Sequence, residues 1–255
     1  MVKTAVILAA GRGTRLKELG TEIPKGFLQL GTKPIIEESL EKLYTAGIER
    51  VIIVTGHVAE KYEDLAARSP GRILTVHNEQ YADSGSLYSL YLAGSALQDP
   101  SKPETEIDRP STEPAGFLLL ESDLVYESRA LEALQRDPRP DLILVSGRTN
   151  SGDEVWVATE GGNLRAMSKD RFRLNGDILG ELVGISKISM PLFARLCEVA
   201  ERLFEKTLHV EYETGLTETA REYPIPCLLI PDLVWAEIDD ANHLERARRL
   251  YGRVS

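Results

Sequence analysis

A short apolar run near the amino terminus, which ends abruptly in glycine, is the feature that most restricts how this chain can fold. Val6, Ile7 and Leu8 are consecutive apolar residues, a pattern typical of a strand that is covered on both faces. Gly11 and Gly13 follow, and glycine allows the backbone to turn tightly and to approach a ligand closely. The pattern predicts a buried strand whose following turn points backbone N–H groups at phosphate oxygens.

Three cations accompany this turn. Arg12 and Arg15 lie in it and directly after it, and Lys25 follows Pro24, so that mobile positive charge stands beside a turn that already favours anions. Two better-known glycine motifs do not fit: Leu16 stands where a dinucleotide fingerprint needs glycine or alanine, and the Gly-Lys-Ser/Thr of a P-loop is missing. A plain strand-to-helix turn with incidental basic residues is the alternative interpretation.

Residues 8–15, together with Pro24 and Lys25, resemble a nucleotidyltransferase signature, Leu-Ala-Ala-Gly-x-Gly-x-Arg with a downstream Pro-Lys. Members of that family use a nucleoside triphosphate to activate a phosphate-bearing small molecule and release pyrophosphate. The resemblance implies a Rossmann-like, GT-A-like α/β fold and a Mg²⁺ cofactor. It also implies a nucleotide-binding loop formed by Leu8, Ala9, Ala10, Gly11 and Gly13. Two catalytic cations, Arg15 and Lys25, would hold the phosphate chain and the attacking anion.

Composition limits the classes of partner. A chain of 255 residues with 42% hydrophobic content can bury a full core, and we expect one nucleotidyltransferase domain over residues 1–255, although such lengths also suit two small domains. A formal net charge of −10 and a pI near 5.1 argue against a nucleic-acid partner, because phosphate backbones are held by basic surfaces.

The cysteines and apolar runs bear on the cellular compartment. Cys197 and Cys227 are far apart in sequence, which gives neither a zinc-ligand spacing nor a disulfide framework. The amino-terminal apolar run is too short for a secretion signal, and no later run approaches membrane-spanning length. We therefore expect a cytoplasmic enzyme with no membrane partner.

Strand-like and helical patterns alternate along the first half of the chain, which predicts an α/β protein with a mixed, mostly parallel central sheet and helices on both faces. The expected strands are 5–9, 51–55, 73–77, 117–120, 154–159, 164–168, 182–188 and 227–230, and the expected helices are 35–46, 58–68, 87–97, 191–205 and 242–251. Residues 98–116 lack an apolar rhythm and are rich in proline, serine, threonine and acidic residues, which indicates a solvated loop insertion.

Two aspartates are the candidate metal ligands. Asp123 directly follows the predicted strand 117–120, and open α/β sheets bind ligands at the carboxyl ends of their strands. Magnesium takes one or two carboxylates plus substrate phosphates, and Asp239 supplies the second. Glu237 alternates with Asp239 along a late strand, so both side chains can face one way, whereas Asp240 is expected to cap the final helix. A turn residue is the alternative for Asp123.

Polar residues between a strand and a helix are the candidates for reading the nucleotide base. Asn78, Ser84, Gly85 and Ser86 place amide and hydroxyl groups there, and Ser122 lies in the loop beside Asp123. Asn78 is also a common turn former, and Ser84 is also a common helix cap. Base reading and these structural roles therefore both stay open.

Further landmarks resemble the cytidylyltransferase branch, which acts on phosphocholine or 2-aminoethylphosphonate and uses CTP. They are residues 84–90, 121–123, 153–154, 168–169, 180–181, 212–213 and 235–239. The acceptors of this branch carry a cationic amine, which explains the many carboxylates. The candidate acceptor-binding residues in or near these landmarks are Asp153, Glu154, Trp156, Lys169, Glu181, Tyr212, Glu213 and Glu237. A core position is the alternative for Trp156, and a solvated surface position is the alternative for the acids and for Lys169.

The nature of the amine decides between the two acceptors. A quaternary ammonium has no N–H donor and is held best by an aromatic cage, whereas a primary ammonium suits carboxylates. Aromatic residues make up 6% of the chain, and acidic residues outnumber aromatic ones near the landmarks. This balance favours 2-aminoethylphosphonate and predicts transfer of CMP from CTP by in-line attack on the α-phosphorus.

Other functions remain open. Phosphocholine cytidylyltransferase is the first alternative, followed by a sugar-1-phosphate nucleotidyltransferase and by a non-catalytic nucleotide-binding regulatory module. Leu192, Leu196 and Leu203 lie on one helical face that either packs internally or joins a second subunit as a homodimer.

Overall fold

Strand β1 (Thr4–Ala9) lies inside a mixed sheet, as its unbroken apolar run requires. The computed structural model describes residues 1–16, 23–98 and 116–254. In it β1 pairs in parallel with β2 (Arg50–Thr55) on one side and with β4 (Gly116–Glu121) on the other. A strand with neighbours on both edges and helices over both faces must be apolar throughout, and residues 5–9 are all buried.

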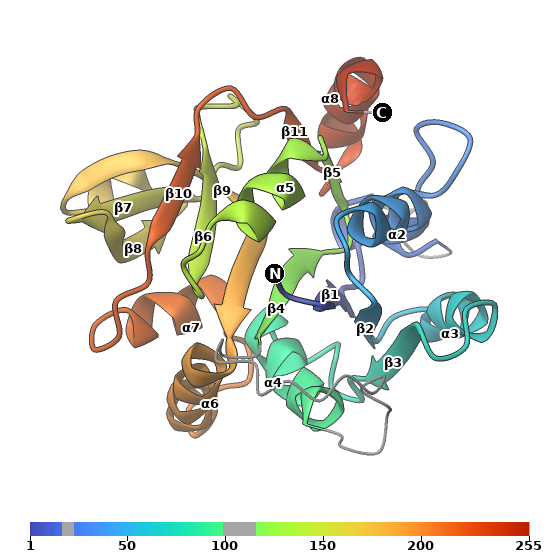
Figure 1. Cartoon of the computed structure of the whole chain (residues 1–255), viewed down its shortest axis with the longest axis horizontal. Coiled ribbons are helices and arrows are strands. Elements are labelled where there is room, and N and C mark those ends of the chain that lie inside the picture. Colours follow the sequence, from blue (N-terminus) through green and yellow to red (C-terminus); the bar gives the residue numbers. More distant parts are fainter. Residues whose placement is uncertain (17–22, 99–115, 255) are drawn as a thin grey trace.

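The described strands form a nine-stranded sheet whose main path runs β10-β6-β9-β4-β1-β2-β3. Strands β1 to β4 are parallel, whereas the long β9 runs antiparallel to β4, β6 and β7. Figure 1 shows the β7–β8 hairpin at one end of the molecule and β3 at the other. The remaining strands of this sheet are β3 (Ile73–His77), β6 (Leu142–Ser146), β7 (Trp156–Glu160), β8 (Asn163–Ser168), β9 (Asp177–Ser189) and β10 (Cys227–Ile230).

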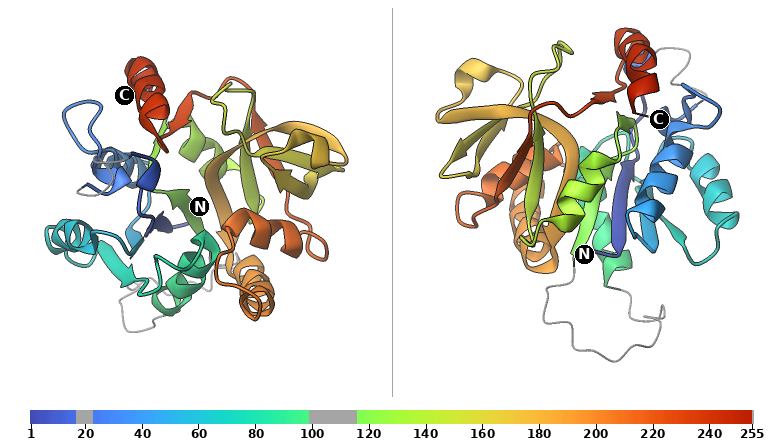
Figure 2. Two further views of the ribbon diagram at one scale, coloured as in Figure 1. Left: turned by 180° about the vertical axis from the view of Figure 1, so that it is seen from behind. Right: turned by 45° about the horizontal axis from the view of Figure 1, so that its top comes forward.

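Helices cover both faces of the sheet, and the side chains of β1 show the division. Ile7 packs in the core cluster with residues of α2, α3 and α5, whereas Val6 and Leu8 pack in the cluster with α4, α6 and α7. Figure 2 shows these two groups from two further directions. The helices are α2 (Ile35–Thr45), α3 (Ala59–Ala67), α4 (Ser86–Leu97), α5 (Arg129–Arg136), α6 (Met190–Phe204), α7 (Tyr212–Thr219) and α8 (Ala241–Leu250), with short 3₁₀ turns at Thr14–Leu16, Lys25–Phe27, Arg171–Arg173 and Tyr251–Arg253.

A smaller third cluster attaches α8 to the sheet. Strands β5 (Leu124–Tyr126) and β11 (Trp235–Glu237) form a two-stranded antiparallel ribbon. Val125 of this ribbon packs with Leu16, Ile238 and Leu244. This cluster brings the chain on either side of β11 next to the loop that follows β4.

The predicted fold class is confirmed, and the differences lie in short elements. Strand β9 begins at Asp177 rather than at 182, and β5, β6, α5 and α7 were not expected. Helix α7 has eight residues, among them glycine and three threonines, which are weak helix formers, so packing of Tyr212 and Leu216 against the core holds it. The predicted loop 98–116 lies outside the described residues except for its two ends.

Two other expectations concern surfaces. Leu192 and Leu196 of α6 are buried in the core cluster between the helix and the sheet, and Leu203 packs against that cluster. This helical face therefore packs internally. Among the described residues, none of the helices combines the length and the apolar character needed to cross a bilayer.

Candidate functional site

The main cavity opens at the carboxyl ends of β1 and β4 and has a volume of about 500 Å³. Most of the predicted site residues line it, although they come from segments that range from Leu8 to Asp239. The predicted residues in its wall are Leu8, Ala9, Ala10, Gly11, Arg15, Lys25, Ser84, Gly85, Ser86, Ser122, Asp123, Asp153, Glu154, Lys169, Tyr212, Glu213, Glu237 and Asp239. Gly13, Asn78, Trp156 and Glu181 are not among the wall residues.

The glycine turn leads from β1 into the cavity wall. Gly13 has a φ of 59°, in the left-handed region that favours glycine, and the N–H of Leu16 donates to its carbonyl over 2.9 Å. At Gly11 a Cβ atom would meet nothing within 4 Å, so the space beside it is open to a ligand. The turn thus ends in the 3₁₀ turn that carries Arg15.

Gly26 explains how Lys25 reaches the floor of the cavity. A Cβ atom at Gly26 would lie 2.9 Å from the Tyr62 hydroxyl and 3.0 Å from the Ser122 carbonyl oxygen. Only a residue without a side chain lets the 3₁₀ turn of residues 25–27 approach this close to the loop after β4. The side chain of Lys25 is consequently only 18% exposed.

Lys25 lies between the two aspartates that the sequence singles out. Its Nζ donates to Oδ2 of Asp123 over 2.7 Å and to Oδ1 of Asp239 over 2.5 Å. Burial opposes the charge on the ammonium, but attraction to both carboxylates outweighs burial and raises the pKa of Lys25. Burial likewise opposes ionisation of Asp239, yet Lys25 and Arg15 lower its pKa. Lys25 and Asp239 are therefore both charged at neutral pH.

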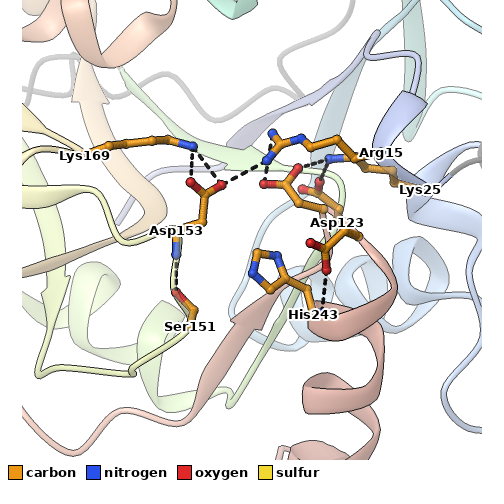
Figure 3. Close-up of polar contacts among 9 residues, drawn as sticks. Arg15, Lys25, Asp123, Ser151, Asp153, Lys169 and His243 are labelled. Carbon is orange, nitrogen blue, oxygen red and sulfur yellow. Dashed lines mark hydrogen bonds and ion pairs between the residues drawn. The ribbon is translucent and has the colours of Figure 1, made fainter.

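Alternating charges continue beyond Asp239, and Figure 3 shows the contacts among Arg15, Asp153 and Lys169. Arg15 approaches Oδ2 of Asp239 at 3.2 Å and donates to Oδ2 of Asp153 over 3.0 Å. Lys169 donates to both oxygens of Asp153 at 2.8 Å. We call the six residues Asp123, Lys25, Asp239, Arg15, Asp153 and Lys169 the charge chain. Every charge within it is paired.

A second group of carboxylates lies beside the charge chain without a paired cation. One ligand oxygen from each of Glu121, Asp123 and Glu237 lies within 4.8 Å of the other two. Among the described residues, the Glu121 carboxylate has one hydrogen-bond partner, the Tyr212 hydroxyl, which donates over 2.6 Å, and the Glu237 carboxylate makes neither a hydrogen bond nor an ion pair. In Glu213 the buried Oε2 has no partner within the described part of the chain. We call Glu121, Glu213 and Glu237 the acid cluster.

The acid cluster resists ionisation. Burial, followed by repulsion from nearby carboxylates, raises the pKa of Glu237 to about 8 and also raises that of Glu121. Burial is also the main cause that raises the pKa of Glu213 to about 7. A cation brought into this part of the cavity would restore the charges on these groups.

The serine segment before α4 is held in place by the chain before α7. The Ser86 N–H and hydroxyl both donate to Oε2 of Glu211, over 3.1 and 2.5 Å, and the Tyr212 N–H donates to the Ser86 hydroxyl. A Cβ atom at Gly85 would lie 2.3 Å from the Val210 carbonyl oxygen, so this contact requires glycine. The alternative of a Ser84 cap is wrong, because Gly85 occupies the cap position and the Glu211 carboxylate takes the free N–H.

Asn78 lies behind this segment. It is fully buried, its Nδ2 donates to the hydroxyls of Ser84 and Ser89 over 3.0 Å, and its Oδ1 accepts from the Gln80 N–H over 2.9 Å. All of its amide groups are thus engaged within the protein. The structure places Asn78 as a support for Ser84 rather than in the cavity wall.

Trp156 and Glu181 pair across β7 and β9 and lie outside the cavity wall. The guanidinium carbons of Arg148 and Arg171 lie 5.6 and 5.2 Å from the Trp156 ring centroid. Glu181 accepts a hydrogen bond from the Thr149 N–H over 2.7 Å. The structure does not bring these two residues together with the other predicted acceptor residues.

Several wall residues had no role in the sequence-based prediction. Glu121 was part of a landmark without an assigned function, although its position one residue before Ser122 could have suggested one. His243 and Arg246 are three residues apart on α8, and this helical spacing places both in the wall. Asp240 caps α8 as predicted, since its side chain accepts from the His243 N–H over 2.9 Å.

Comparisons with known proteins show which proteins the chain is similar to. The family model of the MobA-like NTP transferase domain matches residues 5–254. The chain is 28% identical over 208 residues to the 2-aminoethylphosphonate cytidylyltransferase of Lancefieldella rimae, covering 80% of this chain and 74% of that protein. It is 41% identical over 93 residues to the choline-phosphate cytidylyltransferase of Streptococcus pneumoniae, covering 36% and 40% of the two chains. The solved inositol-1-phosphate CTP transferase of T. maritima shares the fold, with a TM-score of 0.76, 18% identity and coverage of 99% and 96%.

Proposed function

The chain belongs to the family of MobA-like NTP transferase domains, and we propose that it transfers CMP from CTP to 2-aminoethylphosphonate with release of pyrophosphate. Family membership makes the chain a nucleotidyltransferase. The aligned 2-aminoethylphosphonate cytidylyltransferase, which matches over 80% of this chain, supports both the triphosphate and the acceptor. The residues that line the cavity support the same assignment.

The observation that carries the proposal is the presence of two differently charged walls in one cavity. Arg15, Lys25 and Lys169 supply cations for phosphate and phosphonate groups. The acid cluster offers buried carboxylates that have no cation of their own within the described residues. An acceptor with an anionic phosphonate at one end and a primary ammonium at the other would complement both walls.

Each wall has a distinct part in the proposed reaction. The glycine turn, Ser122 and the segment of Ser84, Gly85 and Ser86 bind the nucleotide. A phosphonate oxygen forms a bond to the α-phosphorus, while the bond from that phosphorus to the bridging oxygen of pyrophosphate breaks. Because the nucleophile is already an anion, no general base is required, and Arg15 and Lys25 bring the anions together and neutralise the charge that develops on the leaving group.

The residues present suit a magnesium ion. Asp123 and Asp239 offer the hard carboxylate oxygens that Mg²⁺ prefers, and the ammonium of Lys25 shows that a cation fits between them. Glu121 and Glu237 add further oxygens close to Asp123. When bound, the ion would neutralise phosphate charge during the transfer.

Phosphocholine is the second candidate acceptor. The rings of Tyr212 and Trp235 lie in the cavity wall, and aromatic rings bind quaternary ammonium groups. The aligned choline-phosphate cytidylyltransferase segment supports this alternative. A quaternary ammonium could not, however, donate hydrogen bonds to the acid cluster, so the primary amine suits the cavity better.

A pyrophosphate-release assay tests the proposal. Purified protein with Mg²⁺ is given each nucleoside triphosphate in combination with 2-aminoethylphosphonate, phosphocholine or glucose 1-phosphate. We expect the highest kcat/KM for CTP with 2-aminoethylphosphonate. Faster release with phosphocholine or with glucose 1-phosphate would refute the acceptor, and release with no pair would favour a nucleotide-binding module.

A further inference from the structure

Lys25 occupies a position that a metal ion would need. Its Nζ lies 2.7 Å from one oxygen of Asp123 and 2.5 Å from one oxygen of Asp239, and the side chains of these aspartates are 7% and 4% exposed. The ammonium therefore already offsets the repulsion between two buried carboxylates. A divalent ion that binds the same oxygens must replace it.

The side chain of Lys25 has open space into which it can move. Its backbone is fixed by the close packing of Gly26 against Tyr62 and Ser122, but its side chain lines the open cavity. A triphosphate in that cavity would offer new oxygen partners within reach of a long flexible side chain. A metal ion that arrives without a triphosphate brings no new oxygen partners for the displaced ammonium, so its exchange for Lys25 is less favourable.

We propose that Lys25 acts as an exchangeable internal counter-ion, which holds Asp123 and Asp239 together in the free protein and weakens their binding of a divalent ion unless phosphates arrive with that ion. The inference rests on the metal site of the proposed function. It goes further in stating that the free protein binds divalent ions weakly, and that one lysine causes this weakness.

Arg15 does not replace Lys25 in this role. It reaches Asp239 at 3.2 Å but makes no ion pair with Asp123 among the described residues, and its side chain is 57% exposed. Lys169 is farther still, since its ion pair is with Asp153. Removing the charge of Lys169 is thus a matched control that leaves the contacts of Asp123 and Asp239 intact.

The test measures Mn²⁺ binding in the absence of any nucleotide. Electron paramagnetic resonance reports the concentration of free Mn²⁺. We expect Lys25→Met to bind Mn²⁺ at least tenfold more tightly than the wild type, and Lys169→Met to differ from it by less than twofold. Adding Asp123→Asn to Lys25→Met should remove the gain. Equal or weaker Mn²⁺ binding by a folded Lys25→Met protein would overturn the proposal.

A measurement on the wild type keeps the proposal testable if Lys25→Met does not fold. Nitrogen NMR of lysine ammonium groups, assigned with Lys25→Arg, is followed while Mg²⁺ alone is added to saturation. The Lys25 signal should shift, whereas that of Lys42, which donates to the carbonyls of Tyr126 and Val254, should not. Saturation with Mg²⁺ and an unchanged Lys25 signal would refute the exchange. Neither experiment uses CTP or an acceptor, so failure of the proposed reaction is recognised separately.

Discussion

The charge chain and the acid cluster share one cavity but solve the problem of buried charge in opposite ways. In the charge chain each carboxylate has a cation from the same protein within 3.2 Å, and the pKa of Asp239 is lowered. In the acid cluster the carboxylates have no paired cation among the described residues, and burial is the first cause that raises the pKa values of Glu213 and Glu237 to about 7 and about 8.

This difference separates what the protein supplies from what a ligand must supply. Burying a charge is costly unless it is paired, so buried groups that the protein pairs keep their charges without a ligand. Unpaired buried acids are tolerated only by taking up protons, and their ionised form waits for an external cation. The predictions below either remove this contrast or measure it.

Removing the cation at the centre of the charge chain should have the largest effect. We expect Lys25→Ala to lower kcat for CTP and 2-aminoethylphosphonate at least a hundredfold, since loss of such a preorganised charged contact costs about 3–4 kcal/mol of barrier. Stopped-time pyrophosphate release measures it. Lys33→Ala removes an exposed lysine that pairs with Glu41 and should leave kcat unchanged. A near-normal rate for Lys25→Ala would end its assignment as a catalytic cation.

Asp123 belongs to both regions, because it pairs with Lys25 and lies beside Glu121 and Glu237. Asp123→Asn keeps the shape and removes the charge, and we expect about a hundredfold loss of kcat together with a higher requirement for Mg²⁺. Circular dichroism should show an intact fold. Asp64→Asn, an exposed change on α3, is the control. If Asp123→Asn kept its Mg²⁺ dependence and rate, the metal would have to bind elsewhere.

Neutralising one member of the acid cluster should affect the acceptor and spare the nucleotide. We expect Glu213→Gln to raise the KM for 2-aminoethylphosphonate about tenfold, which corresponds to about 1.4 kcal/mol, with the KM for CTP nearly unchanged. Glu181→Gln is the matched control, because Glu181 is also buried but lies outside the cavity wall. Equal effects on both substrates, or a larger effect of Glu181→Gln, would remove Glu213 from the acceptor wall.

Much of the fold could be predicted from local patterns. The apolar run of β1 and the alternation of strands and helices gave the sheet and its two covered faces, because both follow from the period of burial. Short elements such as α7 could not be found this way. Its sequence is a poor helix former, and it is held by Tyr212 and Leu216 in a core that only the folded chain assembles.

Local sequence patterns also identify individual site residues better than they predict the contacts between them. Arg15 and Lys25 could be singled out because they follow a strand and a glycine turn within one short stretch. That Lys25 would lie between Asp123 and Asp239 depends on the approach allowed by Gly26 and on contacts across 98 and 214 residues of sequence.

Membership of the cavity wall was equally hard to predict from local sequence. The sequence predicts that Glu181 binds the acceptor because it belongs to the landmark 180–181, and that Trp156 does so because it is an aromatic residue near the landmark 153–154. The register of β7 against β9 instead pairs them with each other, outside the wall. A register set by pairing across 25 residues cannot be derived from the neighbours of either residue.

The smallest expected effect is on stability, and it measures the contrast between the two regions directly. A carboxyl group whose pKa is raised in the folded protein binds more protons folded than unfolded between its two pKa values, so the free energy of unfolding falls as pH rises through that range. For Glu237 the range extends from about 4.5 to about 8. We expect urea unfolding of the ligand-free protein to show a loss of at least about 1 kcal/mol between pH 5 and pH 8.

Glu237→Gln should flatten this dependence, because glutamine has no proton to lose. Glu132→Gln, on the exposed face of α5, should leave it as in the wild type. Saturating 2-aminoethylphosphonate should also flatten it, since an ammonium beside Glu237 would lower the pKa that burial had raised. A free energy of unfolding that is constant from pH 5 to pH 8 in the ligand-free wild type would mean that the acid cluster is already ionised and paired, and the two walls would then be alike.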